Sequence, residues 1–291
     1  MPTLSPSQLS IFQLCNRRWQ YQYKEGLLPR VPSSRQMAKG SYIHDILHYY
    51  YGLIQAGYPV GDPDLLVLIR DRINQDIKET PNPDYKFFEE CARTVVNYIL
   101  DRSPVIDSKL KDLQVEAHLE YTLLNGYVLH GFVDLISDAI RDHKTGERNT
   151  FDSKSVSRNQ QLMFYSTLYF KLTGDNLPVE ISWIHSNPPK TSKNPIYSLT
   201  RTSFSDAKLE GFFDYLEKIT DLLLTDQDHL QNFSACGNCP YFHLCDFELK
   251  GLDTALLRKN GYVNKSTKNE ATKEDSKDKP LQALDLRWRG N

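Results

Sequence analysis

Four cysteines at the two ends of the chain constrain its fold more than any other feature. Cys236, Cys239 and Cys245 form a C-x2-C-x5-C cluster, whereas Cys15 lies near the N-terminus. Four thiolates suit a zinc ion or an iron-sulfur cluster. The alternative is a set of scattered core or disulfide cysteines, which the odd total of five disfavours. We therefore predict a metal or cluster centre that clasps the N- and C-terminal segments together.

The fifth cysteine, Cys91, follows a different pattern. It recurs at helical spacing with Phe88, Val95 and Tyr98, which indicates the buried face of a helix. A free cysteine in such a place behaves as a small hydrophobe. We expect Cys91 in the core, apart from the other four.

The composition is that of an ordinary globular protein. Of the 291 residues 40% are hydrophobic, and the net charge is -2, so any attraction of nucleic acid must come from a local patch. No apolar run approaches the ~20 residues of a spanning helix, and the first residues do not resemble a signal peptide. We expect a cytoplasmic protein, or one of the host cytoplasm if the chain is viral, with no membrane partner.

One local basic patch lies between residues 15 and 40. It contains six basic residues against a single acid, Glu25, and it is interleaved with aromatic residues. Such a patch favours nucleic-acid binding. The residues that we expect to contact DNA are Arg17, Arg18, Lys24 and Arg35.

Hydrophobic periodicity predicts an ordered series of helices and strands. Period-two alternation indicates three consecutive antiparallel strands at residues 113–124, 126–137 and 139–146, and a fourth strand at 179–186. Helical spacing is found at residues 4–15, 40–54, 62–103 with a break at TPNPDY, 159–172 and 205–224. This order of helix, three strands, helix and strand predicts an α/β sandwich around a small mixed sheet, with a helical insert at about residues 52–112.

The predicted domain organisation has three parts. Residues 1–250 are expected to form one domain. Residues 251–280 are expected to form a charged, disordered linker, because the run NKSTKNEATKEDSKDKP contains no aromatic residue and no Val, Ile or Leu. Residues 281–291 restore a short apolar segment. Its string QALDLRW resembles the peptides that bacterial sliding clamps accept, and we expect either a protein partner there or a segment that folds back on its own domain.

The hairpin GFVDLISDAIRDHKTG carries the candidate chemistry. With a three-residue turn at residues 137–139, Asp134 lies across from Asp142, and Phe132 lies across from Lys144. Two carboxylates on one face require a cation between them, and oxygen ligands favour Mg²⁺ or Mn²⁺. Lys144 could then orient or deprotonate a water.

A D-x-K triplet alone means little, because it recurs elsewhere in the chain. Asp152-x-Lys154 follows a polar run, and Asp275-x-Lys277 lies in the charged tail. Only Asp142 follows an upstream strand with its own acid at hairpin spacing. We interpret the other triplets as solvated charge pairs.

The set of motifs resembles the RecB-like branch of the PD-(D/E)XK nucleases. The motifs are Gly40-x-x-x-His44, Asp134 in GFVD, Asp142-x-Lys144, and Gln161-x-x-x-Tyr165. The start S-x-S-x-L-x-x-F-x-x-C and the cysteine triplet are similar to the iron-sulfur members, including AddB-type subunits and exonucleases of CRISPR adaptation. Arg141 and His143 depart from the family pattern, which usually has apolar or aromatic residues there.

The resemblance implies a role for each matched residue. His44, Asp134 and Asp142 would bind Mg²⁺ or Mn²⁺, with the backbone carbonyl of His143 as a further ligand, and Lys144 would act with the activated water. Gln161 and Tyr165 would contact the DNA backbone or steady the lysine. Cys15, Cys236, Cys239 and Cys245 would hold a structural 4Fe-4S cluster. Glu116 could be an accessory carboxylate, although an exposed strand glutamate is the commoner outcome.

The function that the resemblance implies is that of a metal-dependent DNA exonuclease. It would hydrolyse phosphodiester bonds at single-stranded or frayed ends, for recombination or repair. The fold implied is the αβββαβ restriction-endonuclease-like core with the helical insert and the iron-sulfur clasp. The alternatives are a catalytically silent DNA-end-binding or scaffold subunit that keeps the cluster, and a zinc-clasped structural protein.

Overall fold

A computed structural model describes residues 1–30, 34–101, 103–107, 110–186, 197–225 and 230–264. The chain divides into two compact units. The first contains residues 1–6 and 33–225, and the second contains residues 7–32 and 226–291. The single domain expected at residues 1–250 is thus divided, because residues 7–32 leave the first unit and join the C-terminal segment in the second.

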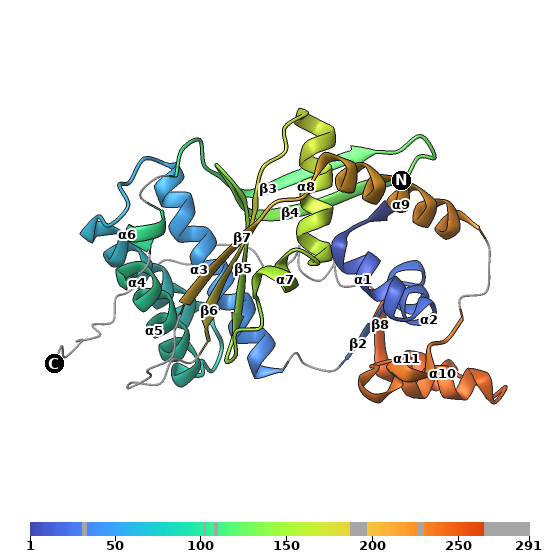
Figure 1. The fold of residues 1–291 in the computed structure, drawn as a ribbon. Helices are drawn as coiled ribbons and strands as arrows, with labels where there is room; N and C mark the ends of the chain where they lie inside the picture. Colours follow the sequence, from blue (N-terminus) through green and yellow to red (C-terminus); the bar gives the residue numbers. More distant parts are fainter. Residues whose placement is uncertain (31–33, 102, 108–109, 187–196, 226–229, 265–291) are drawn as a thin grey trace. The chain divides into compact units, whose positions relative to one another are not determined.

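A mixed six-stranded sheet forms the centre of the first unit (Figure 1). Its strands are β1 (Thr3–Leu4), β3 (Gln114–Thr122), β4 (Val128–Ile136), β5 (Ile140–Gly146), β6 (Val179–His185) and β7 (Tyr197–Thr202). Strands β3, β4 and β5 are consecutive and antiparallel, as predicted, and β6 lies parallel to β5. Strand β4 also pairs with β1, and β6 pairs with β7. Strands β1 and β7 were not predicted.

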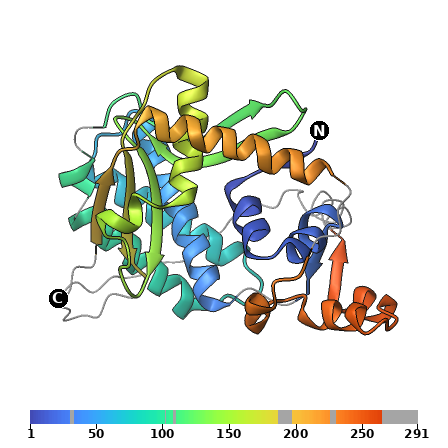
Figure 2. The same ribbon diagram turned by 45° about the vertical axis from the view of Figure 1, so that its right-hand side comes forward.

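Seven helices are described in the first unit. They are α3 (Arg35–Gln55), α4 (Pro63–Glu79), α5 (Tyr85–Asp101), α6 (Ser103–Ile106), α7 (Ser153–Val156), α8 (Gln160–Thr173) and α9 (Asp206–Leu224). Helices α4, α5 and α6 form the helical insert expected at about residues 52–112. Figure 1 shows them gathered beside α3, on one side of the sheet. Figure 2 shows α9 crossing α8, and these two helices pack together.

Local capping explains where the helices that carry the site begin. Ser34 accepts a hydrogen bond from the N–H of Met37, so α3 begins earlier than hydrophobic spacing alone indicates. Asn159 caps α8 through the N–H of Leu162, and Gly174 ends this helix with a φ of 80°. Ser34 and Asn159 are short polar side chains, and each accepts a hydrogen bond from an N–H group of the first helical turn that has no partner within the helix.

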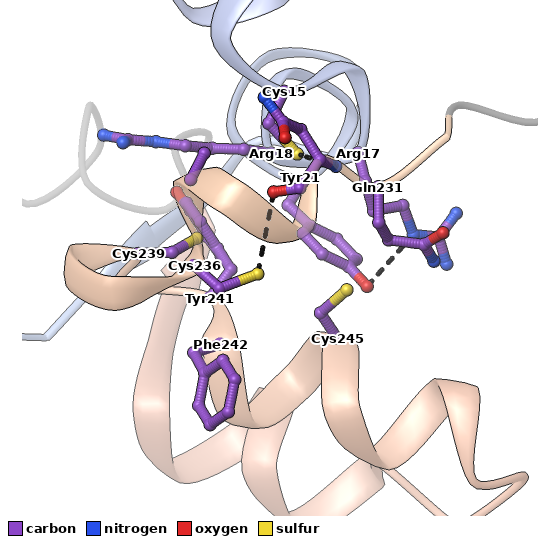
Figure 3. Close-up of a pocket in the computed structure, with 12 residues that line it drawn as sticks. Cys15, Arg17, Arg18, Tyr21, Gln231, Cys236, Cys239, Tyr241, Phe242 and Cys245 are labelled. Atoms are coloured by element: carbon purple, nitrogen blue, oxygen red, sulfur yellow. Dashed lines mark hydrogen bonds between the residues drawn. The ribbon is translucent and has the colours of Figure 1, made fainter.

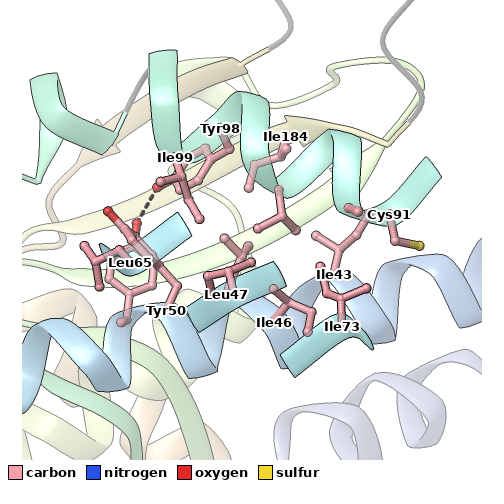
Figure 4. Close-up of a cluster of buried hydrophobic side chains, with 14 of the residues drawn as sticks. Ile43, Ile46, Leu47, Tyr50, Leu65, Ile73, Cys91, Tyr98, Ile99 and Ile184 are labelled. Carbon is pink, nitrogen blue, oxygen red and sulfur yellow. Dashed lines mark hydrogen bonds between the residues drawn. The ribbon is translucent and has the colours of Figure 1, made fainter. Parts of the chain in front are cut away.

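The main core of the first unit lies between α3, α4 and α5 (Figure 4). Ile43, Ile46 and Leu47 of α3 are fully buried there, together with residues of the other two helices and Ile184 of β6. Cys91 belongs to this cluster and is fully buried, which confirms its prediction as a core residue. Burial also raises the pKa of its thiol to about 11.

The second unit joins the two ends of the chain. Its elements are α1 (Pro6–Leu14), α2 (Asn16–Trp19), the π-helix η1 (Gln20–Lys24), β2 (Leu27–Pro29), the 3-10 helix η2 (Phe233–Asn238), α10 (Phe242–Leu249), α11 (Ala255–Gly261) and β8 (Tyr262–Asn264). Strands β2 and β8 pair in an antiparallel ladder. Tyr241 stacks on Tyr21 and on Tyr262, with ring centroids 5.4 and 5.3 Å apart.

Residues 251–264 correct the predicted linker. They carry α11 and β8, and β8 is held by its ladder with β2, so a linker cannot begin at residue 251. The charged run of residues 264–280 begins where β8 ends, and the segment before it contains the apolar residues Leu256, Leu257 and Tyr262. Residues 265–291, with the predicted clamp-like peptide, lie outside the described residues.

Candidate active site and cysteine pocket

Strands β4 and β5 pair only next to their turn. The paired residues are Leu135 with Arg141 and Ile136 with Ile140, which confirms the predicted register. Beyond these pairs the backbone N–H of His143 donates a hydrogen bond of 2.5 Å to Oδ2 of Asp134. If the two strands stayed paired, this N–H would donate to a backbone carbonyl of β4. The side chain of Asp134 accepts the hydrogen bond in place of that carbonyl. Both predicted acids therefore lie where the two strands separate.

Asp142 is buried beside Lys144. The Nζ of Lys144 lies 2.7 Å from Oδ2 of Asp142, and this oxygen accepts no well-directed hydrogen bond from the described residues. Lys144 also donates to Oε1 of Gln161 at 2.8 Å, and Nε2 of Gln161 donates to the hydroxyl of Tyr165 at 2.9 Å. The structure therefore brings Asp142, Lys144, Gln161 and Tyr165 together in one chain of contacts between β5 and α8.

His44 reaches the same acids from α3. Its Nδ1 lies 3.8 Å from Oδ2 of Asp134. Gly40, one helical turn earlier, permits this approach, because a Cβ there would lie 3.0 Å from Oγ1 of Thr145 on β5. The motif Gly40-x-x-x-His44 thus has a steric basis in the contact between α3 and β5.

The two acids have opposite electrostatic environments. Burial raises the pKa of Asp142 to about 6, although Lys144 works against this rise. Burial also acts to raise the pKa of Asp134, but His44 and His143 outweigh it, so the net shift is downward. Burial opposes protonation of His44, yet Asp134 outweighs it and raises the pKa of this histidine. Asp134 is thus the stabilised anion, and Asp142 is the carboxylate that would gain most from a cation.

Glu116 extends the acidic group on the neighbouring strand β3. Its Oε1 lies 3.9 Å from Nδ1 of His48, and burial and then the charge of Asp134 raise its pKa. Its φ of 49° is unusual for a residue other than glycine. Asn82 and Asp112 also have a positive φ, but Glu116 is the one of the three that lies beside the candidate acids. The position of His48 beside Glu116 was not foreseen from the sequence, since only the fold brings α3 to β3.

The side chain of His143, which alternates with Asp142 and Lys144 along β5, lies among aromatic rings. His143 is fully buried and stacks on Tyr51 with ring centroids 5.4 Å apart, while the ring of Tyr98 lies edge-on to it. Burial lowers the pKa of His143 to about 3. The imidazole of His143 thus packs against aromatic rings of α3 and α5, whereas its backbone N–H donates to Asp134.

The buried Arg141 is compensated by two buried acids. Its Nη1 donates to Asp107 at 2.6 Å, and its Nε donates to Glu180 at 2.9 Å. Charged groups are buried at tolerable cost only when they are paired in this way. Arg141, which departs from the family pattern, is thus paired with Asp107 directly after α6 and with Glu180 of β6.

The donor atoms of the first unit suit a hard divalent cation. Asp134 and Asp142 offer oxygens, and Oδ2 of Asp142 has an ammonium as its close polar neighbour. Oxygen ligands of this kind are those that Mg²⁺ and Mn²⁺ prefer. In the described part of the chain no three His, Cys, Asp or Glu side chains are already arranged to share one ion. The residues fit the cation, but it would have to displace Lys144 from Asp142.

The cysteines predicted at the two chain ends do meet, in the second unit. Cys15, Cys236, Cys239 and Cys245 line one pocket with an empty volume of about 350 Å³, part of it open to solvent (Figure 3). None of the five cysteines of the chain forms a disulfide. Burial raises the pKa of the thiols of Cys239 and Cys245, so a bound cation would be needed to hold them as thiolates.

The chemistry of this pocket fits a tetrathiolate centre. All four cysteines are partly exposed, and Arg18 lies close enough to Cys239 to favour its thiolate. A cluster of several iron and sulfide ions is larger than one metal ion, so its ligands stand further apart than those of a zinc site. The same four thiolates can serve either centre.

Direct contacts also join the two segments around this pocket. Arg17 pairs with Glu248, and the hydroxyl of Tyr21 donates to Glu248 at 2.5 Å. Arg258 bridges Glu25 at 2.7 Å and Glu248 at 2.6 Å. The second unit is therefore held by ion pairs and aromatic stacking in addition to any centre that the cysteines bind.

The four basic residues predicted for DNA contact have different environments. Arg17 is engaged with Glu248, and Arg18 is half-buried at the cysteine pocket. Arg35, in the first unit, pairs with Asp84 and lies 3.5 Å from Glu90. Lys24 is exposed. Their role in DNA binding stays a prediction.

Comparison with known families decides the class of this site. Residues 3–246 match the PD-(D/E)XK nuclease superfamily, and this span contains every candidate residue of both units. The chain belongs to the PD-(D/E)XK nuclease superfamily. As a member of this superfamily it has a nuclease fold in which Asp134, Asp142 and Lys144 stand at the positions described above.

The comparison with solved structures supports the fold through one match. A candidate exonuclease from Eubacterium rectale is 15% identical, with a TM-score of 0.53, over 82% of this chain and 87% of that chain. The structure of SSO0001 is 12% identical over 70% of this chain and 94% of that chain, with a TM-score of 0.29. No curated protein matches the sequence. Of the helices described, none is long and apolar enough to cross a membrane.

Proposed function

We propose that this PD-(D/E)XK protein is a metal-dependent DNA exonuclease. The observation that carries the proposal is the convergence of Asp134, Asp142 and Lys144 where β4 and β5 separate, with Gln161 contacting the lysine. The superfamily match and the shared fold with a candidate exonuclease support the class of reaction.

Asp134, Asp142 and His44, with the backbone carbonyl of His143, would hold Mg²⁺ or Mn²⁺. Such a cation supplies a Lewis acid and lowers the pKa of a bound water. Lys144 would leave Asp142 when the cation binds and, as an ammonium, would then orient the attacking water. To deprotonate that water it would first have to lose its own proton to solvent. Gln161 would keep the ammonium of Lys144 in place, because their 2.8 Å hydrogen bond is independent of Asp142. Glu116 is an accessory carboxylate next to Asp134.

The four cysteines would hold a 4Fe-4S cluster with a structural role. Support comes from the pocket that all four side chains line and from the two chain segments that supply them. Zinc is the alternative for the same ligands. Colour separates the two, because an iron-sulfur cluster is brown and a zinc tetrathiolate absorbs no visible light.

End-labelled DNA tests the proposal directly. Purified protein is incubated with single-stranded and double-stranded DNA in Mg²⁺, Mn²⁺ or EDTA, and the ends of the substrates are blocked in turn. An exonuclease releases short products from a free end, stops at a blocked end and is inactive in EDTA. Binding to DNA ends without cleavage in either metal would instead indicate the silent scaffold subunit. Cleavage in EDTA would contradict the metal-dependent mechanism.

A further inference from the structure

An exposed pair of aromatic rings lies on the sheet close to the candidate catalytic acids. Phe132 of β4 pairs in register with His118 of β3, and their rings stack with centroids 4.6 Å apart and planes 18° apart. Phe132 is 54% exposed, and the side chain of His118 is 44% exposed. A phenylalanine in the middle of a strand is usually buried, so this exposure requires an explanation.

The rings are continuous with the candidate active site. Phe132 lies two residues before Asp134 on β4, and His118 lies two residues after Glu116 on β3. Alternate residues of a strand project from the same face, and two residues span ~7 Å. Phe132 and His118 therefore lie about one nucleotide spacing, ~7 Å along their strands, from Asp134 and Glu116.

The other residues of this face limit what the pair can bind. Glu120 lies 3.9 Å from His118 and has a largely exposed side chain, and Glu116 lies on the other side. Carboxylates at both positions disfavour contact with a phosphate, which the acids would repel without a cation. Two rings also present too little area for a protein interface. A flat, uncharged group of similar size is the occupant that fits, and a nucleobase has these properties.

We propose that His118 and Phe132 form a stacking platform for an unpaired nucleobase next to the scissile phosphate. The proposal rests on the nuclease function proposed above and specifies its substrate as single-stranded or frayed DNA. A base within a duplex is already stacked on both faces, so it could reach the platform only after unstacking, which costs free energy. Single-stranded ends offer their bases without this cost.

Fluorescence of 2-aminopurine tests the platform separately from cleavage. A single-stranded oligonucleotide with 2-aminopurine near its end is titrated with the protein in EDTA, so that binding is observed without turnover. Stacking on an aromatic ring quenches the fluorophore. We expect Phe132→Ala to weaken binding about fivefold to a hundredfold and to lose the quenching, whereas Phe132→Trp keeps both. Tyr85→Ala is the matched control, since Tyr85 is 66% exposed on α5.

Further measurements separate this inference from the proposed function. His118→Gln is a second variant that removes one ring from an exposed position, and circular dichroism shows whether each variant is folded. In Mg²⁺ or Mn²⁺, loss of the platform should raise KM for single-stranded DNA more than it lowers kcat. Wild-type protein that quenches the fluorophore but cleaves no DNA would contradict the nuclease function and leave the platform intact. Unchanged binding and quenching in folded Phe132→Ala and His118→Gln would overturn the platform.

Discussion

The backbone N–H of His143 on β5 donates a hydrogen bond to the carboxylate of Asp134 on β4. A side chain here replaces the partner that a neighbouring strand normally supplies. The bond stabilises Asp134 as an anion and holds it beside Asp142, the buried carboxylate of the same hairpin. The same hydrogen bond thus marks where β4 and β5 separate and holds the two acids next to each other.

Substitution of Asp142 or Lys144 by alanine should abolish DNA cleavage. Asp142→Ala removes a proposed metal ligand, and with it the Lewis acid and the activated water, whereas Lys144→Ala removes the group that orients this water. Either loss should raise the barrier by several kcal/mol and lower the rate by about a thousandfold or more. The measurement is kcat/KM with end-labelled DNA in Mg²⁺ or Mn²⁺.

The second D-x-K triplet supplies the matched controls. Asp152 is exposed and accepts a hydrogen bond from the N–H of Ser155 as the N-cap of α7, and Lys154 is exposed. Asp152→Ala should cost about 1 kcal/mol of stability through the lost cap and leave cleavage nearly unchanged, as should Lys154→Ala. An inactive Asp152 variant with an active Asp142 variant would show that the wrong triplet has been assigned.

Cys15→Ser should remove a bound centre from the second unit. Cys15 is the one ligand candidate that comes from the N-terminal segment, so its loss also opens the closed loop between the two chain ends. We expect less iron per protein, loss of brown colour and a lower Tm. Cys91→Ser is the control, because this residue lies in the core of the first unit. It should change stability but not iron content, and the reverse pattern would place Cys91 in the ligand set.

Gly131→Ala should disturb the candidate active site through Tyr165 of α8, which packs against Gly131. A Cβ at Gly131 would lie 2.6 Å from Cε1 of the buried Tyr165, so the ring must move, at a cost of about 1–3 kcal/mol. Since the Tyr165 hydroxyl accepts from Gln161 and Gln161 accepts from Lys144, cleavage should fall as well. Denaturant unfolding and kcat measure the two effects.

Gly211→Ala is the matched control for this substitution. Gly211 lies within α9, and a Cβ there meets no atom within 4 Å. Alanine in a helix interior is favoured over glycine by about 0.5–1 kcal/mol, so this variant should be slightly more stable and fully active. A tolerated Gly131→Ala variant would mean that the contact between α8 and β4 is looser than described.

Arg141→Met should destabilise the first unit strongly. The substitution leaves Asp107 and Glu180 buried with one cation fewer, and breaking a buried ion pair costs about 3–5 kcal/mol. Arg70→Met, at an exposed pair with Asp71, should change the free energy of unfolding by less than about 1 kcal/mol. Urea denaturation compares the two variants, and similar midpoints would show that the buried network contributes little.

The sequence alone determined the strands and the register of the hairpin that carries Asp134 and Asp142. Alternation of apolar residues with period two is a local property, and a three-residue turn leaves one pairing that places Asp134 across from Asp142. The spacing of Cys15 and the C-terminal cysteines similarly predicted that the two chain ends meet. These features depend on residues that are close in sequence or on a small number of distinctive side chains.

Tertiary structure decided the features that depend on distant partners. The sequence could not show that β4 and β5 separate after two pairs. Its period-two alternation continues through both strands, whereas in the structure the N–H of His143 donates to the side chain of Asp134 and not to the backbone of β4. It could not show that Arg141 is buried, because its partners Asp107 and Glu180 belong to other elements. The positive φ of Glu116 is likewise invisible in the sequence. Local patterns select strands and helices, but the environment of a buried charge is set by the side chains that folding brings to it.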